Sequence, residues 1–181
     1  MKVNSISGLT CYMKVVAMND LALRPATAAD MPRLTELVQT AYGHYVERLG
    51  RPPRPMTDDY AEIVHTHRAV VAEGDGELLG LVVLGASDEG FFIDNVAVDP
   101  SHQGTGVGRA LLEHAEAAAR DAGFDTIYLF THERMVENLA LYSRIGYVEY
   151  DRRPDGGASI VYLRKMLGTR HTTTDERRRN R

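Results

Sequence analysis

The chain has 181 residues, enough for one domain with a hydrophobic core and too few for two. A hydrophobic fraction of 44% and a charged fraction of 25% are typical of globular proteins. A net charge of −4 argues against a general nucleic-acid binder, and no apolar run reaches the length of a membrane span. The single cysteine, Cys11, excludes an intramolecular disulfide and is typical of a reducing cytoplasm.

We expect both ends of the chain to be peripheral. Residues 1–17 show neither a hydrophobic period nor the compact apolar stretch of a signal peptide, so we interpret them as an extension before a domain at 18–168. Residues 169–181 hold five arginines, two acidic residues and no large apolar residue. We expect this segment to be a flexible basic tail rather than an anion-binding one.

Between these ends, hydrophobic periodicity predicts alternating strands and helices. Thr27 and Asp30 form a candidate capping box before an amphipathic helix, and three prolines make residues 51–56 irregular. Short turns near residues 74–76 and 87–90 predict an antiparallel meander. The expected strands cover residues 21–24, 69–72, 78–84, 91–98, 127–130, 147–150 and 160–165, and the other expected helices cover 57–65, 106–122 and 136–145.

The main local signal is a glycine-rich turn, SHQGTGVGR at residues 101–109, between an expected strand and the longest expected helix. The first amides of a helix lack helical acceptors and lie at the positive end of its dipole, so the turn predicts an anion site. A Walker loop is excluded because Arg109, not lysine, follows Gly108. Arg109 also replaces the third small residue of a dinucleotide fingerprint. A turn that only caps the helix is the remaining alternative.

Three motifs resemble those of the GNAT superfamily of acetyl-CoA-dependent N-acetyltransferases. Gln103–Gly108 resembles its pyrophosphate-binding Gln/Arg-x-x-Gly-x-Gly/Ala motif, residues 93–100 (IDNVAVDP) its central strand, and residues 141–147 (LYSRIGY) its Leu-Tyr-x-x-x-Gly-Phe/Tyr motif. They occur in the family's order within residues 18–167. The resemblance implies an α/β (α+β) GNAT fold, with a mixed central sheet of about seven strands, splayed in the middle and flanked by about four helices.

The resemblance implies transfer of the acetyl group of acetyl-CoA to a primary amine by direct attack on the thioester. Unpaired main-chain groups of the central strand would bind the pantetheine arm, and the backbone N–H near Val96 would polarise the carbonyl. The implied cofactor-binding residues are Val96, Ala97, Val98, Gln103, Gly104, Thr105, Gly106, Val107, Gly108, Arg109 and Asn138.

Tyr142 matches the family's tyrosine that protonates or hydrogen-bonds the departing sulfur. A phenol with a pKa of about 10 keeps its proton at neutral pH. The family's asparagine seven residues earlier is replaced by Met135, while Asn138 occupies the family's alanine position. Offsets of four and seven return to one helix face, so we expect Asn138 to supply the amide contact. Its alternative role is to cap local backbone.

The general base is open. Asp94 has the strand parity of Val96 and Val98, which makes it a candidate base or amine anchor, or simply a hydrogen-bonding acid. His132 and Glu133 are further candidates. Phe130 replaces a glutamate of the branch that acetylates ribosomal-protein N-termini, which argues against that branch. The candidate acceptor wall is the segment 41–56, with Tyr42, His44, Tyr45 and Arg54.

The expected acceptor is a small-molecule or peptide amine, with no nucleic-acid, membrane or metal partner. His65 and His67 have no neighbouring pattern of metal ligands, so we interpret them as surface residues. The sequence leaves the acceptor and the oligomeric state open, a homodimer included. A non-catalytic acetyl-CoA-binding regulatory domain of the same fold is the alternative function, because Met135 departs from the family pattern.

Overall fold

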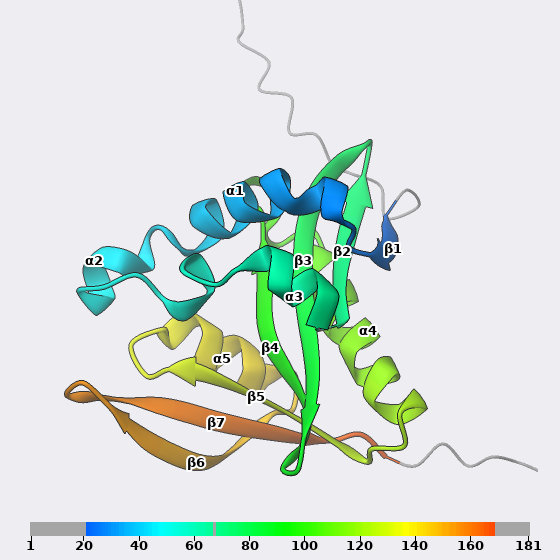
Figure 1. Ribbon diagram of the computed structural model, residues 1–181. Coiled ribbons are helices and arrows are strands. Elements are labelled where there is room, and N and C mark those ends of the chain that lie inside the picture. The colour runs from blue at the N-terminus through cyan, green and yellow to red at the C-terminus, as the bar shows by residue number, and fades with distance from the viewer. Residues whose placement is uncertain (1–20, 67, 169–181) are drawn as a thin grey trace, which may run out of the picture.

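The computed structural model describes residues 21–66 and 68–168 (Figure 1). The predicted extension 1–17, the basic tail 169–181 and His67 lie outside the described residues. Within them, the strands are β1 Ala22–Pro25, β2 Arg68–Gly74, β3 Glu77–Ser87, β4 Gly90–Val98, β5 Thr126–His132, β6 Val148–Asp155 and β7 Ala158–Met166. The α-helices are α1 Met31–Tyr42, α2 Tyr45–Leu49, α3 Tyr60–Thr66, α4 Val107–Asp121 and α5 Val136–Arg144; the 3-10 helices are η2 Ala28–Asp30, η3 Arg54–Met56 and η4 Pro100–His102.

The strands form one mixed sheet in the order β1-β2-β3-β4-β5-β7-β6. The pair β4–β5 is parallel and the other neighbours are antiparallel, so β2, β3 and β4 form the predicted meander. The parallel ladder holds three residue pairs, from Phe91–Ile127 to Ile93–Leu129, and then ends. Because β4 and β5 separate beyond Ile93, the predicted splay in the middle of the sheet is confirmed (Figure 1).

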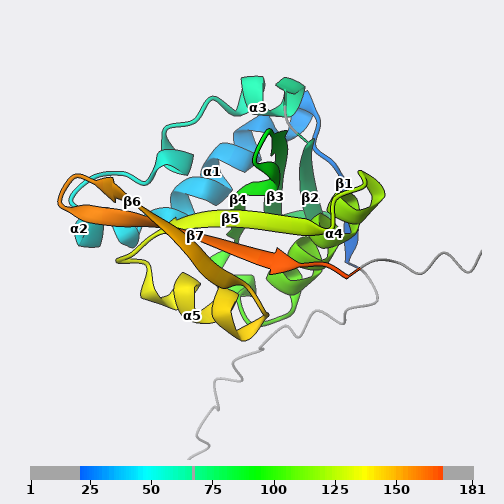
Figure 2. The same ribbon diagram turned by 90° about the horizontal axis from the view of Figure 1, so that it is seen from below.

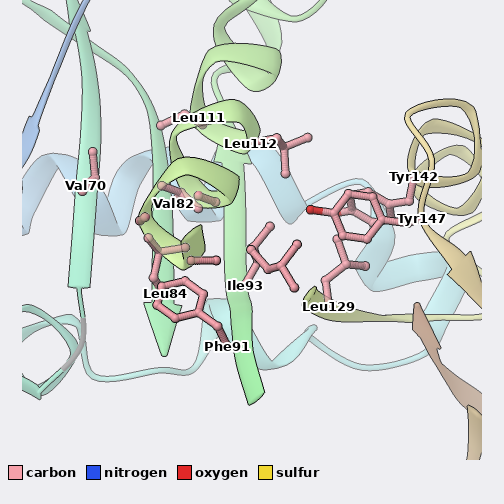
Figure 3. Packing of buried hydrophobic residues seen from close by; sticks show 14 of the residues in the cluster. Val70, Val82, Leu84, Phe91, Ile93, Leu111, Leu112, Leu129, Tyr142 and Tyr147 are labelled. Carbon is pink, nitrogen blue, oxygen red and sulfur yellow. The ribbon is translucent and has the colours of Figure 1, made fainter. Parts of the chain in front are cut away.

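Helices cover both faces of the sheet (Figure 2). Helices α1 and α3 pack on one face, and α4 and α5 on the other. The core under α1 and α3 includes Leu34, Leu37, Val38, Ile63, Val71, Leu81 and Val83. The core under α4 and α5 includes Val70, Val82, Leu84, Phe91, Ile93, Leu111, Leu112, Leu129, Tyr142 and Tyr147 (Figure 3).

The capping residues before α1 form a polar cluster around the buried carboxylate of Asp30. The Thr27 N–H donates to the Asp30 carboxylate at 2.7 Å, as the predicted capping box requires. Arg24 of β1 holds both carboxylate oxygens of Asp30 at 2.8 Å. The box opens the short helix η2, which leads directly into α1.

The close approach of α4 to the sheet depends on a glycine in β3. A Cβ atom built on Gly80 would lie 2.8 Å from Leu111 Cδ1 and 3.0 Å from the Ala97 carbonyl oxygen. The predicted apolar stripe of α4 is confirmed as buried: Leu111, Leu112, Ala115, Ala118 and Ala119. This packing sets the position of the glycine-rich turn that precedes the helix.

Three local expectations differ from the structure. Helix α2 was not predicted, and the proline-rich stretch contains the short helix η3. Tyr147 was assigned to a strand, but β6 begins at Val148 and runs to Asp155. The charged residues of β6 are tolerated because it is an edge strand, exposed along most of its length.

Candidate active site

A cavity of about 590 Å³ lies where the sheet opens. The β4–β5 ladder ends at Ile93 and Leu129, and both residues line the cavity. Its other walls come from α5, from the segment between α1 and α3, and from the β6–β7 hairpin. A cleft with a few converging polar groups is the usual form of a small-molecule site.

Strand β4 carries a β-bulge at this cavity. Val83 of β3 pairs with Asn95, whereas the next residue, Leu84, pairs with Ile93. Asp94 is therefore the extra residue in β4. A bulge of this kind bends the strand, interrupts its ladder and shifts the alternation of its side chains.

The bulge places Asp94 differently from the prediction based on strand parity. Val96 and Val98 pack with the core beneath α4, whereas the Asp94 carboxylate forms an ion pair with Arg54 of η3, next to α1. The Asp94 side chain is 9% exposed and lines the cavity. Its role as base or amine anchor stays a prediction, but its carboxylate is already held by a guanidinium.

Along β4, the backbone N–H and C=O groups of successive residues point alternately toward β3 and away from it. The Asp99 N–H donates to Leu79 O at 2.9 Å, so the β3-facing backbone groups along β4 include those of Ala97. Those of Val96 and Val98 then face the opposite edge, where the Tyr42 hydroxyl shares its one proton between Val96 O at 3.0 Å and Asn95 Oδ1 at 2.7 Å. Ala97 was predicted to bind the cofactor through its backbone, but this geometry favours Val96 and Val98 alone.

Tyr142 enters the cavity from α5. The residue is 6% exposed, and its ring lies 6.0 Å from that of Tyr147 between centroids (Figure 3). Burial, with a smaller contribution from Tyr45, raises the pKa of Tyr142 above its ordinary value of 10.0. The phenol therefore keeps its proton at neutral pH, as a proton donor to a leaving thiolate requires.

Asn138 and Met135 line the cavity beside Tyr142. The Asn138 carbonyl oxygen accepts from Tyr45 O–H at 3.5 Å, and its amide donates to Met135 Sδ at 3.7 Å. Both partners of the Asn138 side chain are thus side chains rather than local backbone. This arrangement does not support the capping alternative.

Of the two other candidate bases, His132 lines the cavity and Glu133 is not among the described lining residues. The Arg134 N–H donates to His132 Nδ1 at 3.1 Å, which puts the proton of the neutral ring on Nε2. Burial lowers the pKa of His132 from 6.5, so the ring is neutral at pH about 7. Glu133 instead lies 3.4 Å from Arg152.

The segment predicted as the acceptor wall closes one side of the cavity. Tyr42 and Arg54 line it, whereas His44 and Tyr45 are not among its described lining residues. Arg51 forms an ion pair with Asp155 and so joins this wall to the β6–β7 hairpin. Sequence reasoning missed the hairpin residues, because they reach the site only through long-range pairing of β7 with β5. They are Arg153, Pro154, Asp155, Ile160 and Tyr162.

The glycine-rich turn forms the N-terminus of α4. Gly104 and Gly106 have φ angles of 78° and 102°, which side chains other than glycine rarely adopt. The first bond into the helix runs from Ala110 N–H to Gly106 O at 2.9 Å. The amides of residues 107–109 precede this bond, so they are donors without helical acceptors at the positive end of the dipole.

The polar side chains of the turn are bound to groups of β4, of the turn itself and of its helix. Thr105 Oγ1 donates to His102 O at 2.6 Å, and the Gln103 amide donates to Val98 O at 3.4 Å. Arg109 donates to Glu113 at 2.7 Å, with 82% of its side chain exposed. An anion at this turn would therefore meet mainly backbone N–H groups.

A family model described as the acetyltransferase (GNAT) family matches residues 31–147, more than half of the chain. The chain belongs to the GNAT acetyltransferase family. The motifs in the glycine-rich turn and in α5 lie within or at the edge of this match. Strand β4 precedes the turn, and α5 follows α4, so the three motifs occur in the predicted order.

Curated GNAT relatives match parts of the chain. Streptothricin acetyltransferase of Streptomyces lavendulae is 32% identical over 83 residues, 44% of either chain. The ribosomal protein bS18-alanine N-acetyltransferase of Escherichia coli K12 is 40% identical over 55 residues, 30% of this chain and 37% of that protein. The chain thus spans less than half the length of these two relatives.

Solved structures of GNAT proteins share the fold. PaiA N-acetyltransferase from Thermoplasma acidophilum, in complex with coenzyme A, has a TM-score of 0.69 at 16% identity and covers 81% of this chain and 98% of its own. YncA from Salmonella typhimurium, with acetyl-CoA, has a TM-score of 0.63 at 23% identity and covers 87% and 99%. Seven strands in a mixed sheet are thus the GNAT fold, with five α-helices in the described residues where about four were expected.

Two further findings concern only residues 21–66 and 68–168. None of their helices is both long enough and apolar enough to cross a membrane. No group of three or more histidine, cysteine, aspartate or glutamate side chains in these residues is arranged to hold a metal ion.

Proposed function

We propose that this chain is an N-acetyltransferase that moves the acetyl group of acetyl-CoA to a primary amine by direct attack on the thioester. One observation carries the proposal: the open edge of β4 at Val96 and the phenol of Tyr142 border the same cavity. A hydrogen-bond donor for a developing oxyanion and a proton donor for a leaving group thus lie on its two sides.

The cofactor would bind across the splay and along the turn. The amides of residues 107–109 would hold the pyrophosphate, and the Val96 and Val98 backbone edge would hold the pantetheine arm. The solved complexes of PaiA with coenzyme A and of YncA with acetyl-CoA support coenzyme A binding in this fold.

The reaction would form one bond and break another. The amine nitrogen bonds to the thioester carbon while the Val96 N–H stabilises the carbonyl oxygen. The carbon–sulfur bond then breaks, and the thiolate takes the Tyr142 proton. The amine loses one proton, for which Asp94 and His132, both in the cavity lining, are the candidate acceptors, and that proton restores the phenol. The products are an N-acetyl amine and coenzyme A thiol.

The proposed acceptor is a small-molecule or peptide amine. The two named relatives illustrate both classes, since one is a streptothricin acetyltransferase and the other acts on a ribosomal-protein alanine. In this chain Arg51 and Asp155 join the walls of the cavity, and Phe130 and Tyr162 add aromatic surface. An amine with an apolar body fits this lining.

Turnover tests the proposal directly. Release of free thiol from acetyl-CoA would be measured with a panel of small amines and of peptides with free N-termini, and the acetylated product would be confirmed by mass spectrometry. Coenzyme A binding by calorimetry is the second readout. Binding without turnover across the panel would favour the non-catalytic regulatory domain, and absence of binding would reject both functions.

A further inference from the structure

A series of hydrogen bonds borders the cavity on the face of the sheet that α1 and α3 cover. Asn95, at the bulge of β4, is 4% exposed. Its Oδ1 accepts from Tyr42 O–H at 2.7 Å, and its Nδ2 donates to Tyr60 Oη at 3.0 Å. Tyr60 O–H in turn donates to Pro55 O at 2.9 Å. The series therefore links α1, β4, α3 and η3.

The direction of every bond in this series is fixed. Tyr60 uses its only proton on Pro55 O, so its oxygen must accept from Asn95. The amide nitrogen of Asn95 therefore faces Tyr60, and its carbonyl oxygen must face Tyr42. An amide of this length supplies one donor and one acceptor at neutral pH, whereas an ionised carboxylate supplies acceptors only.

One end of this series of hydrogen bonds contacts the proposed cofactor edge, and the other end contacts the proposed acceptor wall. Tyr42 O–H also lies 3.0 Å from Val96 O, on the cofactor edge of β4. Pro55 belongs to the acceptor wall, and its neighbour Arg54 holds Asp94. We propose that Asn95 is a positioning residue that sets the spacing between the cofactor edge and the acceptor wall, with Tyr42 and Tyr60 as its two arms. This inference rests on the proposed acetyltransferase function.

The two arms predict a split in kinetic constants. Tyr42→Phe removes the contact to Val96 O, so coenzyme A affinity and kcat should fall roughly 3- to 10-fold while the KM for the amine holds. Tyr60→Phe releases Pro55 O, so the KM for the amine should rise by a similar factor while coenzyme A affinity holds. The matched control is Tyr128→Phe, which loses one hydrogen bond to Ser87 at 3.1 Å; neither residue is in the described lining of the cavity.

Thermal unfolding distinguishes positioning from simple stabilisation. Tyr42→Phe and Tyr60→Phe each lose two hydrogen bonds, so both should lose more stability than Tyr128→Phe, which loses one and should keep all kinetic constants. The proposal would be overturned if Tyr42→Phe and Tyr60→Phe changed the same kinetic constant. It would also be overturned if both variants kept all kinetic constants, as Tyr128→Phe should. If wild-type protein binds coenzyme A but turns over no amine, the proposed function fails, and the coenzyme A affinities of Tyr42→Phe and Tyr60→Phe still decide the inference.

Asn95→Asp gives a second readout. At neutral pH the new carboxylate has no proton to donate to Tyr60, whereas the protonated acid does. Burial raises the pKa of such a carboxyl, so acidification should restore the donor. The activity ratio of variant to wild type should rise from roughly pH 8 to roughly pH 6. A flat ratio in folded variant protein would count against the fixed donor direction.

Discussion

Tyr142 is a phenol whose surroundings keep it protonated while it faces the cavity. We expect Tyr142→Phe to lower kcat by about 10²- to 10⁴-fold, because a positioned proton donor contributes that much, and to leave coenzyme A affinity nearly unchanged. Tyr147→Phe is the matched control, because Tyr147 packs against the same ring and is not among the described lining residues. Steady-state kinetics measures both. Equal activity of the two variants, with chemistry rate-limiting, would assign Tyr142 to packing.

Asn138 is expected to contact the cofactor from α5. Asn138→Ala should weaken coenzyme A binding by about 0.5–1.5 kcal/mol, the value of one hydrogen bond, and leave unfolding of the ligand-free protein nearly unchanged. Tyr45→Phe is the control, because it removes the donor that Asn138 accepts from at 3.5 Å but leaves the amide in place. Calorimetry and thermal unfolding measure the two effects. Lower stability with an unchanged dissociation constant would instead indicate a structural role.

At the scale of elements, the turn before α4 combines left-handed backbone with free amides. Gly106→Val should abolish coenzyme A binding, because a side chain there opposes a φ of 102° and displaces the amides that follow. Gly76→Val is the control, since Gly76 has a φ of 74° in the β2–β3 turn, outside the glycine-rich turn. Both variants should lose about 1–2 kcal/mol of stability. Retained coenzyme A affinity in folded Gly106→Val would refute the site.

The cluster of Arg24, Thr27 and Asp30 predicts a pH dependence of stability. Hydrogen bonds from Arg24 are the main cause that lowers the pKa of Asp30 well below its ordinary 3.8. A carboxyl with a lowered folded pKa adds stability above its unfolded pKa, and this stability is lost as the pH falls through the folded value. The stability gap between wild type and Asp30→Asn should therefore be largest at neutral pH and close below pH 3.8.

The expected size of that gap at neutral pH is about 1–3 kcal/mol, since charged hydrogen bonds are among the stronger ones. Glu77→Gln is the control, because Glu77 and Arg33 form an ion pair with 65% and 55% of their side chains exposed. Exposed pairs contribute at most about 1 kcal/mol. Chemical denaturation across the acid range measures both variants. A gap that does not change with pH would contradict the assigned role of Asp30.

At the scale of the whole molecule, the sequence alone predicts those elements whose pattern lies within a single helix, strand or turn. The apolar period of α1 and α4, the glycines before α4 and the meander turns are local, and each predicted the right element. The same holds for Tyr142 and Asn138, because helical spacing places both on the face that lines the cavity.

The features that the sequence does not predict depend on contacts between distant segments of the chain. The bulge at Asp94 follows from the register of β4 against β3, which no stretch of β4 alone contains. Helix α2 has five residues, too few to show a period, and the exposed β6 shows no alternation of apolar residues. These three elements supply or support the acceptor side of the cavity, which is why its residues were the least predictable.

The short β4–β5 ladder also has a mechanical consequence. The strands β1–β4 form one half of the sheet, and β5, β7 and β6 form the other. Only three residue pairs, together with the core beneath α4 and α5, hold these halves together. A ligand that contacts both halves across the opening would stabilise the state in which they are together. Amide hydrogen exchange in β5 and β7 should then slow when coenzyme A binds, while exchange in β1 and β2 stays the same. Uniform slowing across the sheet would mean that all strands open together in one cooperative unit. Cofactor binding and release would then not require the two halves to separate.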